Sequence, residues 1–221
     1  MTMIAEQKPK TSRPRGRPRR EDEGEVTARI LDAATDLFLK NGVAATSCEA
    51  VVARARVGKA SLYSRYSGKD ALFEAVVQQA VDRGAISVAA PAPPTATLRD
   101  RLAIAGRAVL LQAVSPLPLA LMRLFLTEAR RFPALIAEVD GMARSRVVDI
   151  VAGAVMAGRK ETDASERAVT IAERFLDLTF APIMLSALTG HDAAKSVSTI
   201  DSTIASALDM MDRSGLLQDF R

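Results

Sequence analysis

The sequence predicts an all-α protein. Apolar residues recur at spacings of three and four along most of the chain, as in Ile30, Ala33 and Leu37, and residues at these spacings share one face of a helix. No stretch shows the sustained alternation of apolar and polar residues that a half-buried strand requires. We therefore expect helices throughout the folded part of the chain.

The first four helices each have a recognisable start or end. The first ends at Asn41-Gly42, a pair typical of a left-handed C-cap. Thr46 and Glu49 have the spacing of a capping box and predict a short second helix. A tight turn at residues 56–58 leads to a third helix over about residues 59–66. The fourth helix has one apolar face, made of Leu72, Phe73, Val76, Val77 and Ala80.

A connector separates these four helices from the rest of the chain. Residues 89–97 hold three prolines and break the helical period. Beyond them, helical patterns cover about residues 96–114, 116–130, 133–157, 163–189 and 192–213. We expect a disordered basic arm over residues 1–24, a small domain over residues 25–86, and a helical regulatory and dimerisation domain over residues 96–221.

Charge is distributed unevenly along the 221 residues. Residues 1–80 hold 14 Lys and Arg against 10 Asp and Glu, whereas the remaining 141 residues hold 16 of each, so the whole excess of +4 lies in the first third. Such an asymmetry suggests that this third binds a polyanion. No apolar run approaches the about 20 residues that cross a bilayer, and no signal peptide is apparent, so we expect a cytoplasmic protein without a membrane partner.

The residues available for chemistry are few. Cys48 is the only cysteine and His191 the only histidine, which excludes an intramolecular disulfide, a multi-His/Cys metal site and most nucleophile–histidine arrangements within a single chain. We expect Cys48 to be a small packed residue rather than a redox switch, and His191 to be a surface residue. No catalytic residue, cofactor or metal is expected.

The third predicted helix carries the clearest functional signal. It is short, follows a short helix and a tight turn, and bears small, hydroxylated and basic side chains, a composition that suits a recognition helix in the major groove of DNA. Between Arg54 and Lys69 there are five Lys and Arg and no acid. A solvated basic face on a helical bundle is the alternative interpretation.

Residues 29–77, RILDAATDLFLKNGVAATSCEAVVARARVGKASLYSRYSGKDALFEAVV, resemble the DNA-binding domain of the TetR/AcrR family of bacterial regulators. The family's first helix matches Ile30 to Gly42, and Thr46-Ser47 opens its second. Its later positions are filled by Val57, Leu62, Tyr63, Tyr66, Lys69 and Leu72. The sequence departs from the pattern at Arg56, where the turn glycine is usual, at Gly58, where a serine is usual, and at Arg65, where an aromatic residue or histidine is common.

The resemblance implies which residues contact DNA. Thr46, Tyr63, Tyr66 and Lys69 would hold phosphates, with Ser47 beside them at the start of the second helix. Lys59, Ser61, Ser64 and Arg65 would face base edges. Two of these have a structural alternative, since Tyr66 could be a core aromatic residue and Thr46 only a helix cap.

The N-terminal arm is a second DNA signal. Residues 13–20 contain Gly-Arg-Pro flanked by arginines, which resembles an AT-hook core. Arg15 and Arg17 would enter the narrow minor groove of A·T-rich DNA, while Gly16 and Pro18 keep the backbone slim and extended. A basic tail that only adds solubility is the alternative.

The resemblance also implies a homodimeric repressor that a small ligand releases from its operator, although activation stays open. We expect a small apolar ligand in a pocket formed by Met122, Phe125, Leu126, Phe175 and Met184, unless these are ordinary core residues. We expect a dimer interface formed by Phe175, Leu178, Ile183, Ile200, Ile204, Leu208 and Met211, with Leu185 on the same candidate surface, unless these residues pack within one chain. The rival functions are a non-specific architectural DNA binder and a helical enzyme.

The arm gives the first testable prediction. Residues 8–20 carry seven Lys and Arg and no acid, and each phosphate neutralised adds roughly 0.9 to the log–log salt slope. Deleting residues 1–22 should weaken binding and flatten that slope by roughly two to four units, measured by titration of duplex DNA at several salt concentrations. Unchanged affinity and slope would identify the arm as a solubilising tail.

Overall fold

The computed structural model describes residues 20–83, 92–93, 95–157, 163–190 and 193–218. These residues form helices and no strand, so the all-α prediction is confirmed. The helices are α1 Arg20–Asn41, α2 Cys48–Ala55, α3 Lys59–Tyr63, α4 Lys69–Arg83, α5 Leu98–Ala113, α6 Pro116–Glu128, α7 Pro133–Met156, α8 Asp163–Leu188 and α9 Ala193–Arg213.

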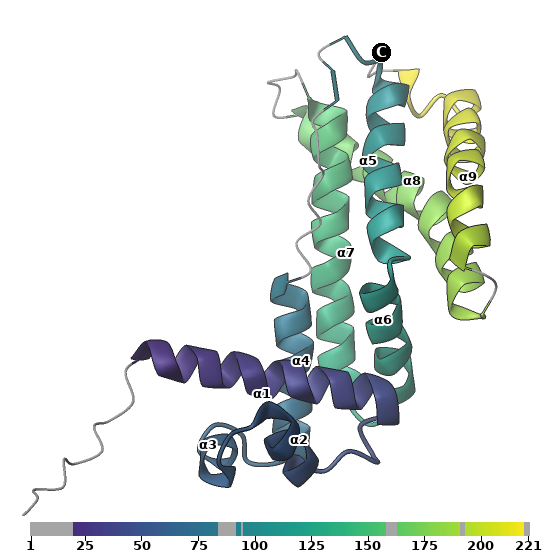
Figure 1. Ribbon diagram of the computed structural model, residues 1–221. Coiled ribbons are helices and arrows are strands. Elements are labelled where there is room, and N and C mark those ends of the chain that lie inside the picture. Colours follow the sequence, from purple (N-terminus) through teal and green to yellow (C-terminus); the bar gives the residue numbers. More distant parts are fainter. Residues whose placement is uncertain (1–19, 84–91, 94, 158–162, 191–192, 219–221) are drawn as a thin grey trace, which may run out of the picture.

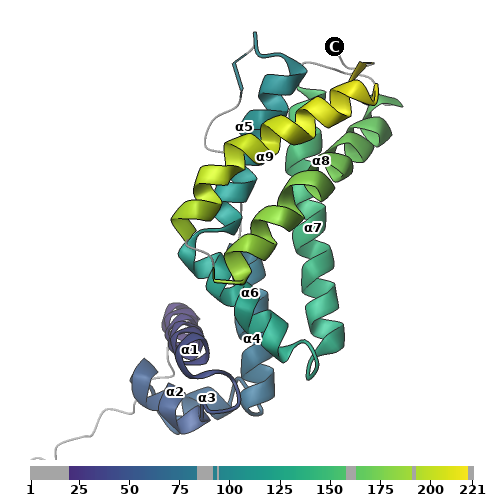
Figure 2. The same ribbon diagram turned by 90° about the vertical axis from the view of Figure 1, so that its right-hand side faces the viewer.

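The helices are arranged along the axis of the long helix α7 (Figure 1). Helices α1, α2 and α3 gather at one end, α5, α8 and α9 at the other, and α6 lies between them. Helix α4 runs from the first group alongside α7. Seen from the side, α8 and α9 lie next to each other and form one face of the larger part (Figure 2).

Two helix boundaries differ from the sequence prediction. Helix α1 begins at Arg20, so residues 20–24 belong to a helix and not to a disordered arm. Helix α3 ends at Tyr63 instead of Tyr66, and the chain continues as a turn in which the Tyr66 N–H donates to the Leu62 carbonyl at 2.9 Å. The core arm residues Arg15, Gly16, Arg17 and Pro18 lie outside the described residues, as does His191.

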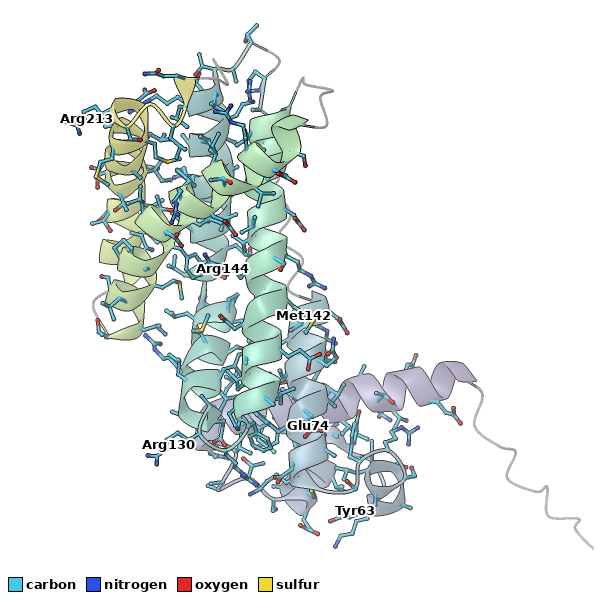
Figure 3. All side chains as sticks on the ribbon, turned by 180° about the vertical axis from the view of Figure 1, so that it is seen from behind. Tyr63, Glu74, Arg130, Met142, Arg144 and Arg213 are labelled. Atoms are coloured by element: carbon cyan, nitrogen blue, oxygen red, sulfur yellow. The ribbon has the colours of Figure 1, made fainter. Side chains whose placement is uncertain are left out.

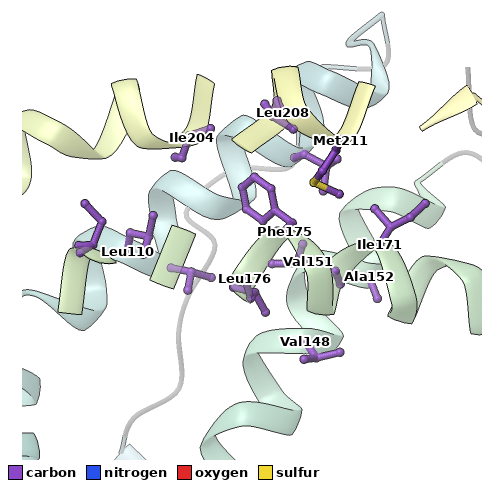
Figure 4. Packing of buried hydrophobic residues seen from close by; sticks show 14 of the residues in the cluster. Leu110, Val148, Val151, Ala152, Ile171, Phe175, Leu176, Ile204, Leu208 and Met211 are labelled. Atoms are coloured by element: carbon purple, nitrogen blue, oxygen red, sulfur yellow. The ribbon is translucent and has the colours of Figure 1, made fainter. Parts of the chain in front are cut away.

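The larger hydrophobic core is built by α5, α7, α8 and α9. Phe175 of α8 is fully buried at its centre, beside Ile204, Leu208 and Met211 of α9 (Figure 4). Its ring lies against the backbone of α5 at Gly106, where a side chain would leave no room for it. The close approach of α5 and α8 therefore depends on a glycine.

This packing corrects the predicted dimer interface. Of the residues expected there, six are at most 3% exposed within a single chain, Leu178 is half-buried against the same core, and only Leu185 is exposed. The six are Phe175, Ile183, Ile200, Ile204, Leu208 and Met211. The apolar stripe of α9 faces α5 and α8 of its own chain, so the alternative of packing within one chain is correct.

A second core joins the first four helices to the rest of the protein. It contains buried residues of α1, α2, α3 and α4, together with Leu124 of α6 and Val139 of α7. The Phe73 ring of α4 lies 5.9 Å from that of Phe38 in α1, edge to face, and 4.9 Å from that of Phe132, which precedes α7. The N-terminal helices thus share their core with α6 and α7.

Among the described helices, none is by itself long and apolar enough to cross a membrane. Helices α5 and α6 meet the requirements of length and composition only when counted together, and the chain bends by 65° between them.

The contact between Gly106 and Phe175 gives a prediction on stability. A Cβ at residue 106 would overlap the Cε1 and Cζ atoms of the Phe175 ring. We expect Gly106→Ala to lower the free energy of unfolding by about 1–3 kcal/mol, because overpacking outweighs the higher helix propensity of alanine.

The matched control is Gly153→Ala in the exposed face of α7, where nothing lies within 4 Å of the added Cβ. Alanine there should raise the free energy of unfolding by up to about 1 kcal/mol. Both values come from denaturant unfolding followed by circular dichroism. Equal effects of the two substitutions would contradict the packing described for Phe175.

Candidate nucleic-acid interface and ligand cavity

Helix α2 is capped by Ser47, whose hydroxyl oxygen accepts a hydrogen bond from the Ala50 N–H at 3.1 Å. The predicted capping box of Thr46 and Glu49 is therefore wrong. Thr46 is only 3% exposed, and its hydroxyl donates to the carbonyl of Gly42 at 2.9 Å. Its side chain closes the turn between α1 and α2 and is not presented to a phosphate, whereas the exposed Ser47 stands at the start of α2.

Arg56 forms the turn between α2 and α3 in a left-handed conformation, with φ 55° and ψ 48°. Its N–H donates to the Ala53 carbonyl, and the Val57 N–H donates to the Val52 carbonyl, both at 3.3 Å. This is the position at which the TetR/AcrR pattern has glycine, and the left-handed conformation costs a residue with a side chain roughly 1–2 kcal/mol. The exposed Arg56 side chain places a positive charge at this turn.

Helix α3 buries Leu62 and exposes its other face at one end of the molecule. Lys59, Tyr63 and Ser64 are exposed, and Ser61 is half-buried. Tyr63 projects from the end of the protein opposite to Arg213 (Figure 3). The short helix begins after Gly58, which makes no side-chain cap.

Glu49 of α2 lies beside this face, although the sequence analysis did not place it there. Its Oε1 accepts from the Tyr63 hydroxyl at 3.3 Å and lies 3.8 Å from the Lys59 Nζ. The negative charge of Glu49 is the main reason that the pKa of Tyr63 is raised. The Glu49 carboxylate holds Lys59 and Tyr63 side by side. The local sequence gives no sign of this contact, because it depends on how α2 packs against α3.

The structure holds the Arg65 side chain against its own chain, and its contact with base edges stays a prediction. Its Nε donates to the Thr27 hydroxyl of α1 at 3.1 Å, and its Nη1 donates to the Ser61 carbonyl at 2.8 Å. The side chain is part-buried and ties α3 to the N-terminal part of α1. Thr27 is therefore a second residue that sequence reasoning missed.

The last two predicted contacts lie just beyond α3. Tyr66 is half-buried against the core of the N-terminal helices, and burial raises its pKa, which favours the core-aromatic alternative. The Lys69 Nζ donates to the Ala44 carbonyl at 2.7 Å, so its ammonium group is held beside the turn between α1 and α2. The structure thus brings Ser47, Lys59, Ser61, Tyr63, Ser64 and Lys69 to one end of the protein.

A cavity of about 200 Å³ lies between α4, α5, α6, α7 and α8. Of the residues predicted for a ligand pocket, Met122, Phe125 and Met184 line it. Leu126 and Phe175 do not. Leu126 is 56% exposed on the outer face of α6, and Phe175 is fully buried in the larger core.

Comparisons with known proteins agree with this architecture. The family described as bacterial regulatory proteins of the tetR family matches residues 30–76, and the C-terminal domain of AefR-like transcriptional repressors matches residues 100–213. The chain belongs to the TetR family. Its α1–α4 region corresponds to the family's helix-turn-helix DNA-binding domain, and members of this family are transcriptional regulators.

Curated relatives match the N-terminal part. The HTH-type transcriptional repressor Rv3405c of Mycobacterium tuberculosis is 45% identical over 53 residues, which are 24% of this chain and 28% of the relative. The HTH-type transcriptional regulator YdeS of Bacillus subtilis is 43% identical over 70 residues, which are 31% and 34% of the two chains. The chain therefore spans about a third or less of the length of these relatives.

Solved structures match the whole fold at low identity. A TetR-family regulator from Mesorhizobium loti has a TM-score of 0.68 at 19% identity, covering 85% of this chain and 97% of that one. The Flavonoid-responsive Regulator FrrA has a TM-score of 0.64 at 22% identity, covering 89% and 97%. The TetR-like arrangement thus extends over both parts of the protein.

Proposed function

We propose that this protein represses transcription by binding operator DNA as a homodimer, and that a small apolar ligand releases it. The helix-turn-helix and the basic arm would hold the DNA, and the domain over residues 96–221 would bind the ligand and the second copy. The observation that carries this proposal is the face of α3 at one end of the protein, where Lys59 and Tyr63 are exposed and Ser61 is half-buried. A DNA partner also implies action in the cytoplasm.

The residues divide between two kinds of DNA contact. Lys59 and Ser61 stand in the first turn of α3, where side chains of a recognition helix reach base edges. Ser47, Tyr63 and Lys69 lie around them with hydroxyl and ammonium groups suited to phosphates. Glu49 would turn Lys59 and Tyr63 toward the groove without itself binding the anionic backbone.

Response to a ligand is supported by the cavity that adjoins α4. FrrA, which shares the fold, is named for its response to flavonoids. A ligand in the cavity would favour a conformation in which the two recognition helices no longer match half-sites about one helical turn apart. The equilibrium between the two conformations, and not a loss of folding, would control DNA binding.

Selection of bound duplexes from a random pool tests the recognition helix. We expect Lys59→Ala and Ser61→Ala to change the selected sequence, since each good contact to a base edge discriminates by about 1–3 kcal/mol. Lys69→Ala should weaken binding to all sequences alike and lower the salt slope by about 1, because it removes a phosphate contact. If both α3 variants select the original sequence, this docking is wrong.

Arg107→Ala serves as the matched control. Arg107 is an exposed cation on α5 that pairs with Asp201 of α9 at 3.0 Å, far from α3. Its removal should change neither sequence preference nor salt slope. Competition with random duplex separates the proposal from the architectural rival, because specific binders prefer their site by roughly 10³-fold or more.

The outer faces of α8 and α9 are the proposed dimer surface. The inner faces pack within the chain, yet Leu185 of α8 is 65% exposed, and Val197 and Met210 of α9 are 40% and 47% exposed. Helices α8 and α9 lie side by side and form one face of the larger part, against which we place the second copy. An isologous four-helix contact between two copies would bury these three side chains.

Leu185→Glu tests this surface. A buried unpaired carboxylate costs more than about 1.4 kcal/mol, so the dimer dissociation constant should rise at least about tenfold in sedimentation velocity. Leu126 of α6 is also exposed, at 56%, and Leu126→Glu should leave the dimer intact. A monomeric wild-type protein at micromolar concentration would contradict the homodimer.

A further inference from the structure

The cavity beside α4 has one charged residue in its wall. Apart from Gln112 and Arg146, all lining residues are apolar, and no carboxylate is among them. The apolar lining comes from α4, α5, α6, α7 and α8 and includes the rings of Phe125 and Phe180. Such a wall suits a ligand with an apolar body and a single polar group.

Arg146 has no acidic partner among the residues that the structure describes. Its Nη1 donates to a neutral group, the carbonyl of Val81 in α4. Arg144, two residues earlier on α7, does have an acidic partner. It lines a neighbouring cavity of about 220 Å³ together with Asp140 and Asp177, and its Nη2 lies 3.0 Å from the Asp177 Oδ1. The hydrogen bond with Asp177 raises the pKa of Arg144.

The two cavities therefore differ in charge. They share Met122, Ala143, Val147 and Phe180 in their walls, so they lie next to each other. The one with Arg144 contains two carboxylates and would repel an anion. The one with Arg146 contains a cation and no carboxylate, so charge complementarity favours an anionic group there.

The contact between Arg146 and Val81 lies at the end of α4. Val81 is in the last turn of this helix, where carbonyl groups lack intrahelical partners and a cation is stabilising. Through this contact α7 holds the C-terminal end of α4. The N-terminal end of α4 belongs to the DNA-binding domain. A ligand that engages Arg146 thus acts on the position of α4.

We infer that the cavity binds a small apolar acid, that its carboxylate pairs with Arg146, and that this pairing withdraws the guanidinium from the Val81 carbonyl. This inference rests on the proposed function, because it specifies the ligand class and the release step of the same regulator. A carboxylate is a stronger acceptor than a carbonyl and matches the guanidinium with two parallel hydrogen bonds. Binding of the acid and capping of α4 then compete for the Arg146 side chain.

The volume limits the size of the acid. About 200 Å³ is below the roughly 300–1,000 Å³ of pockets that hold drug-sized molecules. One aromatic ring with a short chain, or a medium-length alkyl chain, fills such a space. 4-Phenylbutyrate has these properties, and 4-phenylbutanamide is its neutral counterpart of nearly the same shape.

Calorimetric titration of the full-length protein without DNA tests the ligand class. We expect wild-type protein to bind 4-phenylbutyrate at least about tenfold more tightly than 4-phenylbutanamide, as expected for a charge-assisted hydrogen bond. Arg146→Met should abolish the preference, and Arg146→Lys should restore part of it. Arg144→Met should keep it. Three outcomes would overturn the inference. They are equal affinity for acid and amide, a preference for the acid that survives in Arg146→Met, and no binding of the acid at millimolar concentration.

Binding to the selected operator tests the release step. Without ligand, Arg146→Met should bind operator at least about fivefold more weakly than wild type, since it lacks the Val81 contact, while Arg146→Lys stays close to wild type. Far-UV circular dichroism and the Tm of each variant show that it is folded. Operator affinity of folded Arg146→Met equal to wild type would overturn the release step. Failure to select any operator would contradict the proposed function and leave the acid preference measurable.

Discussion

The contact of Phe73 with Phe38 and Phe132 determines how the DNA-binding helices are attached to the rest of the protein. Phe73 is fully buried, and the three rings come from α4, from α1 and from the loop before α7. Arg131 reinforces this junction, because it pairs with Asp70 of α4 while its guanidinium lies 5.0 Å from the centre of the Phe132 ring. The N-terminal helices therefore cannot change their packing on α6 and α7 without opening their own core.

This arrangement makes α4 the element through which the two ends of the protein are coupled. At its end nearer α3 it is fixed by the aromatic contact, and at its other end Arg83 pairs with Asp32 of α1 at 2.6 Å. The cavity borders the same end through Ala80 and Val81. Under the proposed function, a shift of α4 at the cavity would be transmitted through α1 and α2 to α3, because packed interiors are close to incompressible. The separation of two recognition helices in a dimer is sensitive to such a change.

Much of the fold was predictable because its signals are local. Helical periodicity and Gly or Pro at helix ends placed α5 to α9 within about two residues of their bounds, as is usual for such boundaries. The site was less predictable because its contacts join distant residues. Arg65 binds Thr27, 38 residues away, and Tyr63 binds Glu49 on another helix. Thr46 has the sequence of a cap, yet a carbonyl supplied by the preceding turn decides where its hydroxyl points.

The stripe of α9 shows a different limit of sequence reasoning. An apolar face of a helix must be covered, but periodicity does not tell whether a neighbouring helix of the same chain or a second copy covers it. Here α5 and α8 cover it, which leaves Leu185, Val197 and Met210 as the exposed large apolar side chains of α8 and α9 among the described residues. A dimer through this surface would have a small apolar centre and a polar rim. Its geometry would then depend on complementary charges as well as on burial, and under the proposed function such a contact would let the two halves move relative to each other when the operator is released.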